Sequence, residues 1–160
     1  MNPWANRAVR NLVRLADVAT DCINLRLKDY GLHIASSQAL AVLDGASGPL
    51  TPNQISGHLH LTSGTVTSLL DSLERRGLLR RDQHPEDRRK VLVSITDEGR
   101  ALVDAYLPET VAIQTALLSG LGADDLAALN HSLELALSSA PAVDPQAVAA
   151  AAPARQRPTG

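Results

Sequence analysis

Apolar side chains recur at helical spacing in the stretch from Leu61 to Gly77. Four of them stand at i, i+3, i+4 and i+7, which predicts a helix with one buried stripe. These four are Val66, Leu69, Leu70 and Leu73. Thr62 or Ser63 is placed to cap the start of this helix, and Gly77 is expected to end it.

The face opposite this stripe carries short polar side chains near the start of the helix. Such side chains can exchange hydrogen bonds with base edges in a DNA major groove, and arginines at the far end can contact phosphates. A solvated helix face, with cations favoured at its C-terminal end, is the plainer interpretation. On the DNA-binding interpretation, the contacting residues are Thr62, Ser63, Gly64, Thr65, Thr67, Ser68, Arg75 and Arg76.

A β-hairpin is predicted directly after this helix. Residues 78–81 and 91–95 flank a polar tip, and the second segment places β-branched residues at every second position. A tip that carries arginines can enter the minor groove of DNA, although an ordinary solvated turn would have a similar composition. Asp87 is expected to pair with a neighbouring arginine and to hold the tip in shape. The tip residues expected at the DNA are Asp87, Arg88, Arg89 and Lys90.

Two shorter helices are predicted before the polar-faced helix. The first spans residues 36–44 and is expected to be capped by Ser36 or Ser37, and a short edge strand is expected at 49–50. Thr51 caps the second, with proline next and Gln54 at the position of a capping box. Two short helices, a turn and a third helix with a polar first turn predict a helix-turn-helix.

Both ends of the chain are predicted to be helical. One long helix is expected over 3–29. After the hairpin, one helix is expected from Thr96 onward, with a kink at Pro108, and a last one from Asp124 onward. Their apolar stripes exceed what a domain of this size can cover, and exposing such surface is costly. We therefore expect a homodimer joined by the two ends of the chain. The residues expected in this interface are Leu12, Leu15, Leu126, Leu129 and Leu133.

Several segments in sequence resemble the MarR (multiple-antibiotic-resistance regulator) family, with matching order and spacing from about residue 50 to residue 100. The resemblance implies a mainly α fold with a small β wing, in which a winged helix-turn-helix at 35–96 lies between dimerisation helices at 1–34 and 97–139. Residues 140–160 are rich in alanine and proline and are expected to be a disordered tail. The segments that carry the resemblance are 65–67, 69–73, 74–78, 87–89 and 95–100.

The resemblance also implies a function. We expect a dimeric, sequence-specific DNA-binding transcription regulator on a palindromic operator, a repressor released by a small aromatic effector. Two alternatives stay open at this stage. One is a helical dimeric interaction protein that has lost DNA binding, and the other is a regulator that senses oxidants through Cys22, whose neighbours instead favour a packed thiol.

Charge and composition narrow the classes of function. The net charge is -2, yet residues 72–90 hold seven Arg or Lys against four acids, whereas residues 101–160 hold six acids and two arginines. The basic charge therefore gathers where DNA contact is expected. We expect no enzyme, cofactor or metal site, because the sequence shows no catalytic framework and its five histidines lack ligand spacing. A single cysteine and the lack of a long apolar run favour a cytoplasmic protein without a membrane segment.

Overall fold

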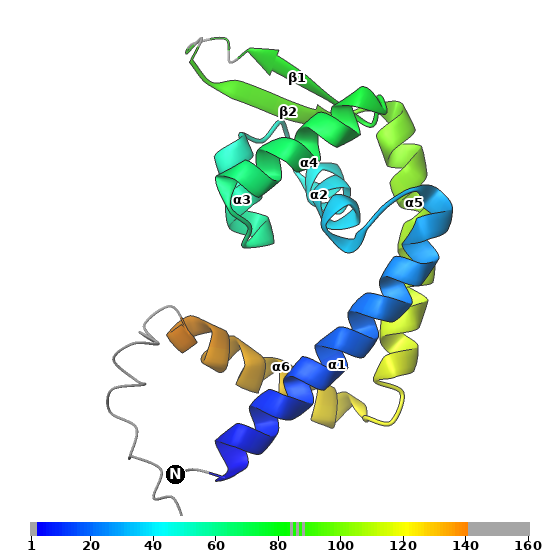
Figure 1. The fold of residues 1–160 in the computed structure, drawn as a ribbon, viewed down its shortest axis with the longest axis vertical. Helices are drawn as coiled ribbons and strands as arrows, with labels where there is room; N and C mark the ends of the chain where they lie inside the picture. The colour runs from blue at the N-terminus through cyan, green and yellow to red at the C-terminus, as the bar shows by residue number, and fades with distance from the viewer. Residues whose placement is uncertain (1–2, 84, 86, 88, 141–160) are drawn as a thin grey trace, which may run out of the picture. The chain divides into compact units, whose positions relative to one another are not determined.

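The computed structural model describes residues 3–83, 85, 87 and 89–140. It is mainly helical with one small antiparallel sheet, which confirms the predicted fold class (Figure 1). The chain forms two compact units, one ending at Leu117 and the other beginning at Leu118. The elements are α1 (Pro3–Leu27), the 3-10 turn η1 (Lys28–Tyr30), α2 (Ile34–Gly45), α3 (Pro52–Leu59), α4 (Ser63–Arg75), β1 (Leu79–Gln83), β2 (Val91–Ile95), α5 (Asp97–Leu117) and α6 (Ala123–Ser139).

Two helix starts lie where local sequence signals predict them. Thr51 Oγ1 accepts a hydrogen bond from Gln54 N at 3.3 Å, and Thr51 N donates to Gln54 Oε1 at 2.8 Å, which completes the capping box of α3. Thr62 caps α4, because its hydroxyl oxygen accepts from Thr65 N at 3.3 Å. Both caps satisfy backbone donors that the first turn of a helix leaves without a partner.

The predicted start of α2 is wrong. The helix begins at Ile34 rather than Ser36, and neither serine caps it. The Ile34 amide instead donates to Asn24 Oδ1 on α1 at 2.8 Å. Ser37 is buried within the helix, and its hydroxyl donates to the Ile34 carbonyl at 2.9 Å. A cap supplied from another helix leaves no signal in the local sequence.

The wing is a two-stranded antiparallel hairpin in which Leu79 pairs with Ile95 and Arg81 pairs with Val93. The first strand begins one residue later than predicted and extends to Gln83. The predicted edge strand at 49–50 is reduced to a single bridge, where Leu50 and Val93 exchange two backbone hydrogen bonds of 3.0 and 2.8 Å. Val93 and Ile95 are buried while Val91 is partly exposed, so one face of the hairpin packs on the helices.

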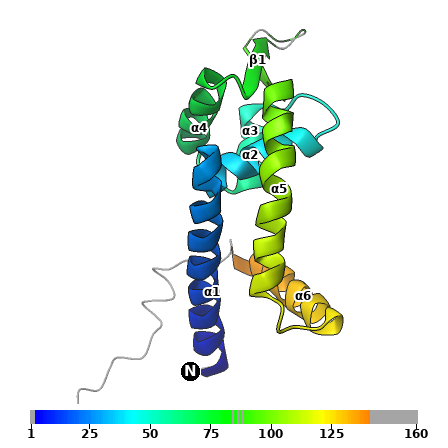
Figure 2. The ribbon, with the colours of Figure 1, turned by 90° about the vertical axis from the view of Figure 1, so that its right-hand side faces the viewer.

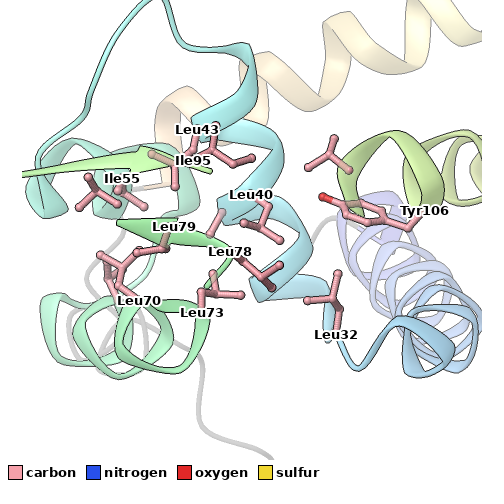
Figure 3. Close-up of a cluster of buried hydrophobic side chains, with 14 of the residues drawn as sticks. Leu32, Leu40, Leu43, Ile55, Leu70, Leu73, Leu78, Leu79, Ile95 and Tyr106 are labelled. Atoms are coloured by element: carbon pink, nitrogen blue, oxygen red, sulfur yellow. The ribbon is translucent and has the colours of Figure 1, made fainter. Parts of the chain in front are cut away.

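The core of the first unit lies between α2, α4 and the hairpin, as Figure 3 shows. Leu40, Leu70, Leu73 and Leu79 are almost fully buried there. Tyr106 of α5 is also buried, and its hydroxyl donates to the Ser37 carbonyl of α2 at 2.6 Å (Figure 3). Each fully buried leucine contributes roughly 1.5–3 kcal/mol to stability. The apolar side of α4 is thus held firmly, while its other side faces solvent.

The two long helices of this unit, α1 and α5, contact one another beside the winged domain (Figure 2). Helix α5 begins after Thr96, whose hydroxyl oxygen accepts from Gly99 N at 3.1 Å, and it continues through Pro108 to Leu117. Only Ile23 and Leu27 of α1 are buried, so most of this helix is exposed. None of the described helices combines the length and the apolar character that crossing a membrane requires.

Helix α6 belongs to the second unit. In its first turn, Asp125 Oδ2 accepts a hydrogen bond from Gly122 N at 3.3 Å. None of its residues is buried, and Leu135 and Leu137 are widely exposed. The expected tail from Ala140 to Gly160 lies outside the described residues except for Ala140 itself.

Candidate nucleic-acid interface

Helix α4 has one buried side and one exposed side, as its sequence pattern predicts. Val66, Leu70 and Leu73 are buried, and Leu69 is half-buried. All the residues expected to contact DNA from the first two turns are exposed. They are Thr62, Ser63, Gly64, Thr65, Thr67 and Ser68. The side chains of this face are small, so a partner can approach the helix closely.

Two hydroxyl groups on this face donate hydrogen bonds to the backbone of their own helix. Thr67 Oγ1 donates to the Ser63 carbonyl at 2.9 Å, and Ser68 Oγ donates to the Gly64 carbonyl at 3.2 Å. In Thr67 and Ser68 the hydroxyl proton is therefore used by the backbone, while the oxygen lone pairs stay available as acceptors. In a major groove such acceptors match the amino groups of adenine and cytosine.

The two arginines at the end of α4 differ in their surroundings. Arg75 is exposed and has no ion-pair partner among the described residues. Arg76 Nη1 donates to the Gly31 carbonyl at 2.7 Å, and its Nη2 donates to the Tyr30 carbonyl at 2.9 Å. The Arg76 guanidinium already donates to two carbonyls within the protein. Phosphate contact therefore stays a prediction for Arg75, whereas Arg76 has other partners.

An ion-pair cluster that the sequence analysis missed joins the wing to α4. Arg81 Nη1 of β1 lies 2.5 Å from Asp71 Oδ1 and 3.1 Å from Glu74 Oε2. The three residues are half-buried, and both carboxylates of α4 contact the same arginine of the hairpin. Ten and seven residues separate these partners along the chain, so only the packed hairpin brings them together.

The tip of the wing is organised around Asp87. Its Oδ1 accepts from the Arg89 amide at 3.1 Å and lies 3.5 Å from Arg89 Nε, while its Oδ2 lies 3.7 Å from Lys90 Nζ. The predicted pairing of Asp87 with a neighbouring arginine is confirmed. The Arg89 side chain remains 94% exposed, so its charge can still reach a partner. Arg88, also predicted at the DNA, lies outside the described residues.

A shallow hollow of about 300 Å³ lies where the wing meets the start of α3. Two cationic side chains border it, and so does the positive end of a helix dipole, a combination that attracts anions such as a DNA phosphate. Its lining residues are Thr51, Pro52, Asn53, Arg89, Lys90 and Val91.

Two further expectations concern chemistry away from this surface. Cys22 is exposed in the single chain rather than packed, so the sequence interpretation of its surroundings is wrong. Within residues 3–140, apart from the three gaps at the wing tip, no group of three or more His, Cys, Asp or Glu side chains is placed to hold a metal ion.

This arrangement of helix-turn-helix and wing matches known proteins. Residues 45–91 match the model of the MarR family. The chain carries a MarR family domain. It is 36% identical over 98 residues to the uncharacterised HTH-type transcriptional regulator YkoM of Bacillus subtilis, covering 61% of this chain and 63% of YkoM. The HTH-type transcriptional repressor YetL of the same organism is 35% identical over 69 residues, covering 43% of this chain and 41% of YetL.

Solved structures of MarR-type proteins share the fold. AbsC, a MarR family transcriptional regulator from Streptomyces coelicolor, superposes with a TM-score of 0.82 at 18% identity, over 89% of this chain and 98% of AbsC. S. aureus MepR, solved in complex with DNA, superposes with a TM-score of 0.74 at 25% identity, over 82% of this chain and 96% of MepR. The matched relatives are transcription regulators rather than enzymes. The chain covers less than two thirds of the length of YkoM and of YetL.

Proposed function

We propose that this MarR family chain is a sequence-specific DNA-binding transcription regulator. The main support is the first half of α4, where one face is exposed and offers hydrogen-bond acceptors while the opposite face is buried in the core. In this proposal α4 lies in the major groove, and the wing tip with Arg89 contacts the neighbouring minor groove. Exposed cations at the wing and at Arg75 would contact phosphates and supply most of the affinity.

The proposed active form is a homodimer. Leu12 and Leu15 of α1 are 39% and 38% exposed, and Val13 between them is 54% exposed. Helix α6 of the second unit has exposed leucines of its own, Leu135 and Leu137. Leaving so much apolar area in water is unfavourable. A two-fold pair of chains would place two copies of α4 on a palindrome, with half-sites one helical turn or a multiple of it apart.

We further propose that the regulator represses and that a small aromatic effector releases it. The repressor assignment rests on the similarity to YetL, which is named as a repressor. A cavity of about 100 Å³ lies between α1, α2 and α5, bordered by Ile23, Tyr106 and Thr110 among others. Sites for small molecules usually measure about 300–1,000 Å³. An effector would therefore favour a state in which these helices separate, and would shift the population away from the DNA-binding arrangement.

A gel-shift experiment tests the DNA-binding proposal. The full chain is mixed with genomic fragments from the region of its own gene and with scrambled fragments, each at two salt concentrations. We expect one preferred fragment and an affinity that falls steeply as salt rises, because phosphate contacts release counterions. Equal, weak binding to all fragments, or none, would show that the fold has lost DNA recognition.

A further inference from the structure

Arg76 ties the end of α4 to a turn that lies 45 residues earlier in the chain. Its two terminal nitrogens donate to two consecutive carbonyls, those of Tyr30 and Gly31, at 2.9 and 2.7 Å. The planar fork of a guanidinium suits two neighbouring acceptors, whereas a lysine ammonium acts as a point donor. Gly31 holds the left-handed conformation at a φ of +64°, and a Cβ placed there would lie 3.4 Å from Arg76 Nη2.

The same turn is attached to α5 on its other side. Tyr30 Oη donates to Glu109 Oε2 at 2.8 Å, and Arg26 donates to both Glu109 oxygens at 2.5 and 2.6 Å. The Arg26 guanidinium also lies 5.8 Å from the centre of the Tyr30 ring. A continuous set of polar contacts therefore runs from α5 through the end of α1 to the end of α4.

We propose that Arg76 is a positioning residue for DNA binding, and that it orients α4 against the α1–α5 pair without contacting phosphate. The proposal rests on the proposed DNA-binding function. Since α4 is held by packing along one side only, the fork at its last turn limits rocking about that packed side. Any shift between α1 and α5 would then move α4 directly.

The neighbouring Arg75 provides a matched comparison. It carries the same charge at the same helix end, but it is exposed and has no ion-pair partner among the described residues. Removing either arginine subtracts one positive charge from the same region. Only removal of Arg76 breaks the link to the turn at Tyr30 and Gly31.

The test measures DNA affinity by fluorescence anisotropy as a function of salt for the wild type, Arg76→Ala and Arg75→Ala. A lost phosphate contact lowers the slope of log K against log salt by about 0.9. We expect Arg76→Ala to bind about tenfold more weakly with the wild-type slope. A slope reduced by about 0.9, or an unchanged affinity, would overturn the proposal. Arg75→Ala shows what slope change a charge lost at this helix end produces.

Two further variants separate positioning from a general loss of folding. Arg76→Lys keeps the charge but not the fork, so we expect it to bind several-fold more weakly than the wild type while remaining folded by circular dichroism. Wild-type affinity in Arg76→Lys would overturn the proposal. Gly31→Ala disturbs the acceptor turn, and its effect on affinity should not add to that of Arg76→Ala, because both break one link. Fully additive effects would contradict action through the turn.

The outcome also distinguishes this inference from the proposed function. Should the wild-type protein fail to prefer any DNA fragment, the proposed function fails. A different result would support the function and reject positioning by Arg76. In it, the wild type binds one fragment with a steep salt dependence, and Arg76→Ala lowers the salt slope as the loss of a phosphate contact does.

Discussion

Arg81 Nη1 lies 2.5 Å from Asp71 Oδ1, and this ion pair joins the first strand of the wing to the middle of α4. The Arg81 side chain is 25% exposed, whereas that of its neighbour Arg80 is 70% exposed. Partial burial and a second carboxylate, that of Glu74, make the Arg81 contact stronger than an ordinary surface pair. The Arg81 guanidinium therefore adds a polar link between the wing and α4 to the packing of Leu79 and Val93 in the core.

Replacement of Arg81 by alanine should lower the free energy of unfolding by about 1 kcal/mol, the upper end for ion pairs that water still reaches. Urea denaturation measures this value. Arg80→Ala is the matched control and should change stability by less than about 0.5 kcal/mol, since it removes an exposed side chain. Equal effects of the two substitutions would show that the link between wing and helix adds nothing.

Thr67 should contribute to the choice of DNA sequence rather than to overall affinity. Thr67→Val keeps the branched shape but removes the acceptor oxygen, so discrimination between the preferred site and its variants should fall by about 1 kcal/mol. Competition binding with single-base variants of the preferred fragment measures this change. Ser72→Ala, on an exposed position further along α4, should leave the ranking of sites intact. An unaltered ranking in Thr67→Val would refute base reading by this residue.

Asp87 should favour DNA binding although its charge is negative. Its carboxylate holds the Arg89 amide and lies near the Arg89 and Lys90 side chains, so Asp87→Ala should loosen the tip and weaken binding several-fold. Asp82→Ala removes an equal charge from the strand and should bind at least as well as the wild type. Anisotropy titration of both variants decides between the roles, and tighter binding by Asp87→Ala would mean that the carboxylate only repels phosphate.

The contacts of Glu109 with Arg26 and Tyr30 should make the free energy of unfolding depend on pH in the acid range. Hydrogen bonds from Arg26, and then from Tyr30, lower the pKa of Glu109 below its ordinary value of 4.5. The unfolded chain then binds the proton first, so this contribution is present above pH 4.5 and is lost as the pH falls through the folded pKa. Urea denaturation between pH 6 and about pH 3 should show a smaller loss for Glu109→Gln than for the wild type.

The control for that experiment is Glu134→Gln, at an exposed position of α6 with no hydrogen-bond partner among the described residues. It should follow the pH dependence of the wild type. Identical profiles for the wild type and Glu109→Gln would show that the cluster is not coupled to folding.

Local signals in the sequence were sufficient for much of the fold. The box formed by Thr51 and Gln54, the cap at Thr62 and the apolar stripe of α4 each depend on residues within one or two helical turns. The start of α2 could not be predicted in this way, because its cap is Asn24 on another helix. Propensity near Ser36 favoured a later start, and the tertiary contact overrode it.

In the candidate interface, too, the contacts within one short segment could be predicted from the sequence and those between distant segments could not. Exposure of Thr65 and Thr67 follows from the helical period, and pairing of Asp87 with Arg89 follows from their separation of two residues. The partners of Arg76 and Arg81 come from packing between distant segments. The charge pattern alone therefore indicates where DNA contact is expected, but not which arginines bind other parts of the protein.

The central claim, that two copies of α4 and two wings read one DNA duplex, is tested most directly by hydroxyl-radical footprinting on the fragment preferred in gel shifts. The account predicts two protected half-sites separated centre to centre by about 10–10.5 base pairs or a multiple of that spacing. It also predicts that protection disappears at high salt. A single protected half-site, or uniform protection along the fragment, would contradict it.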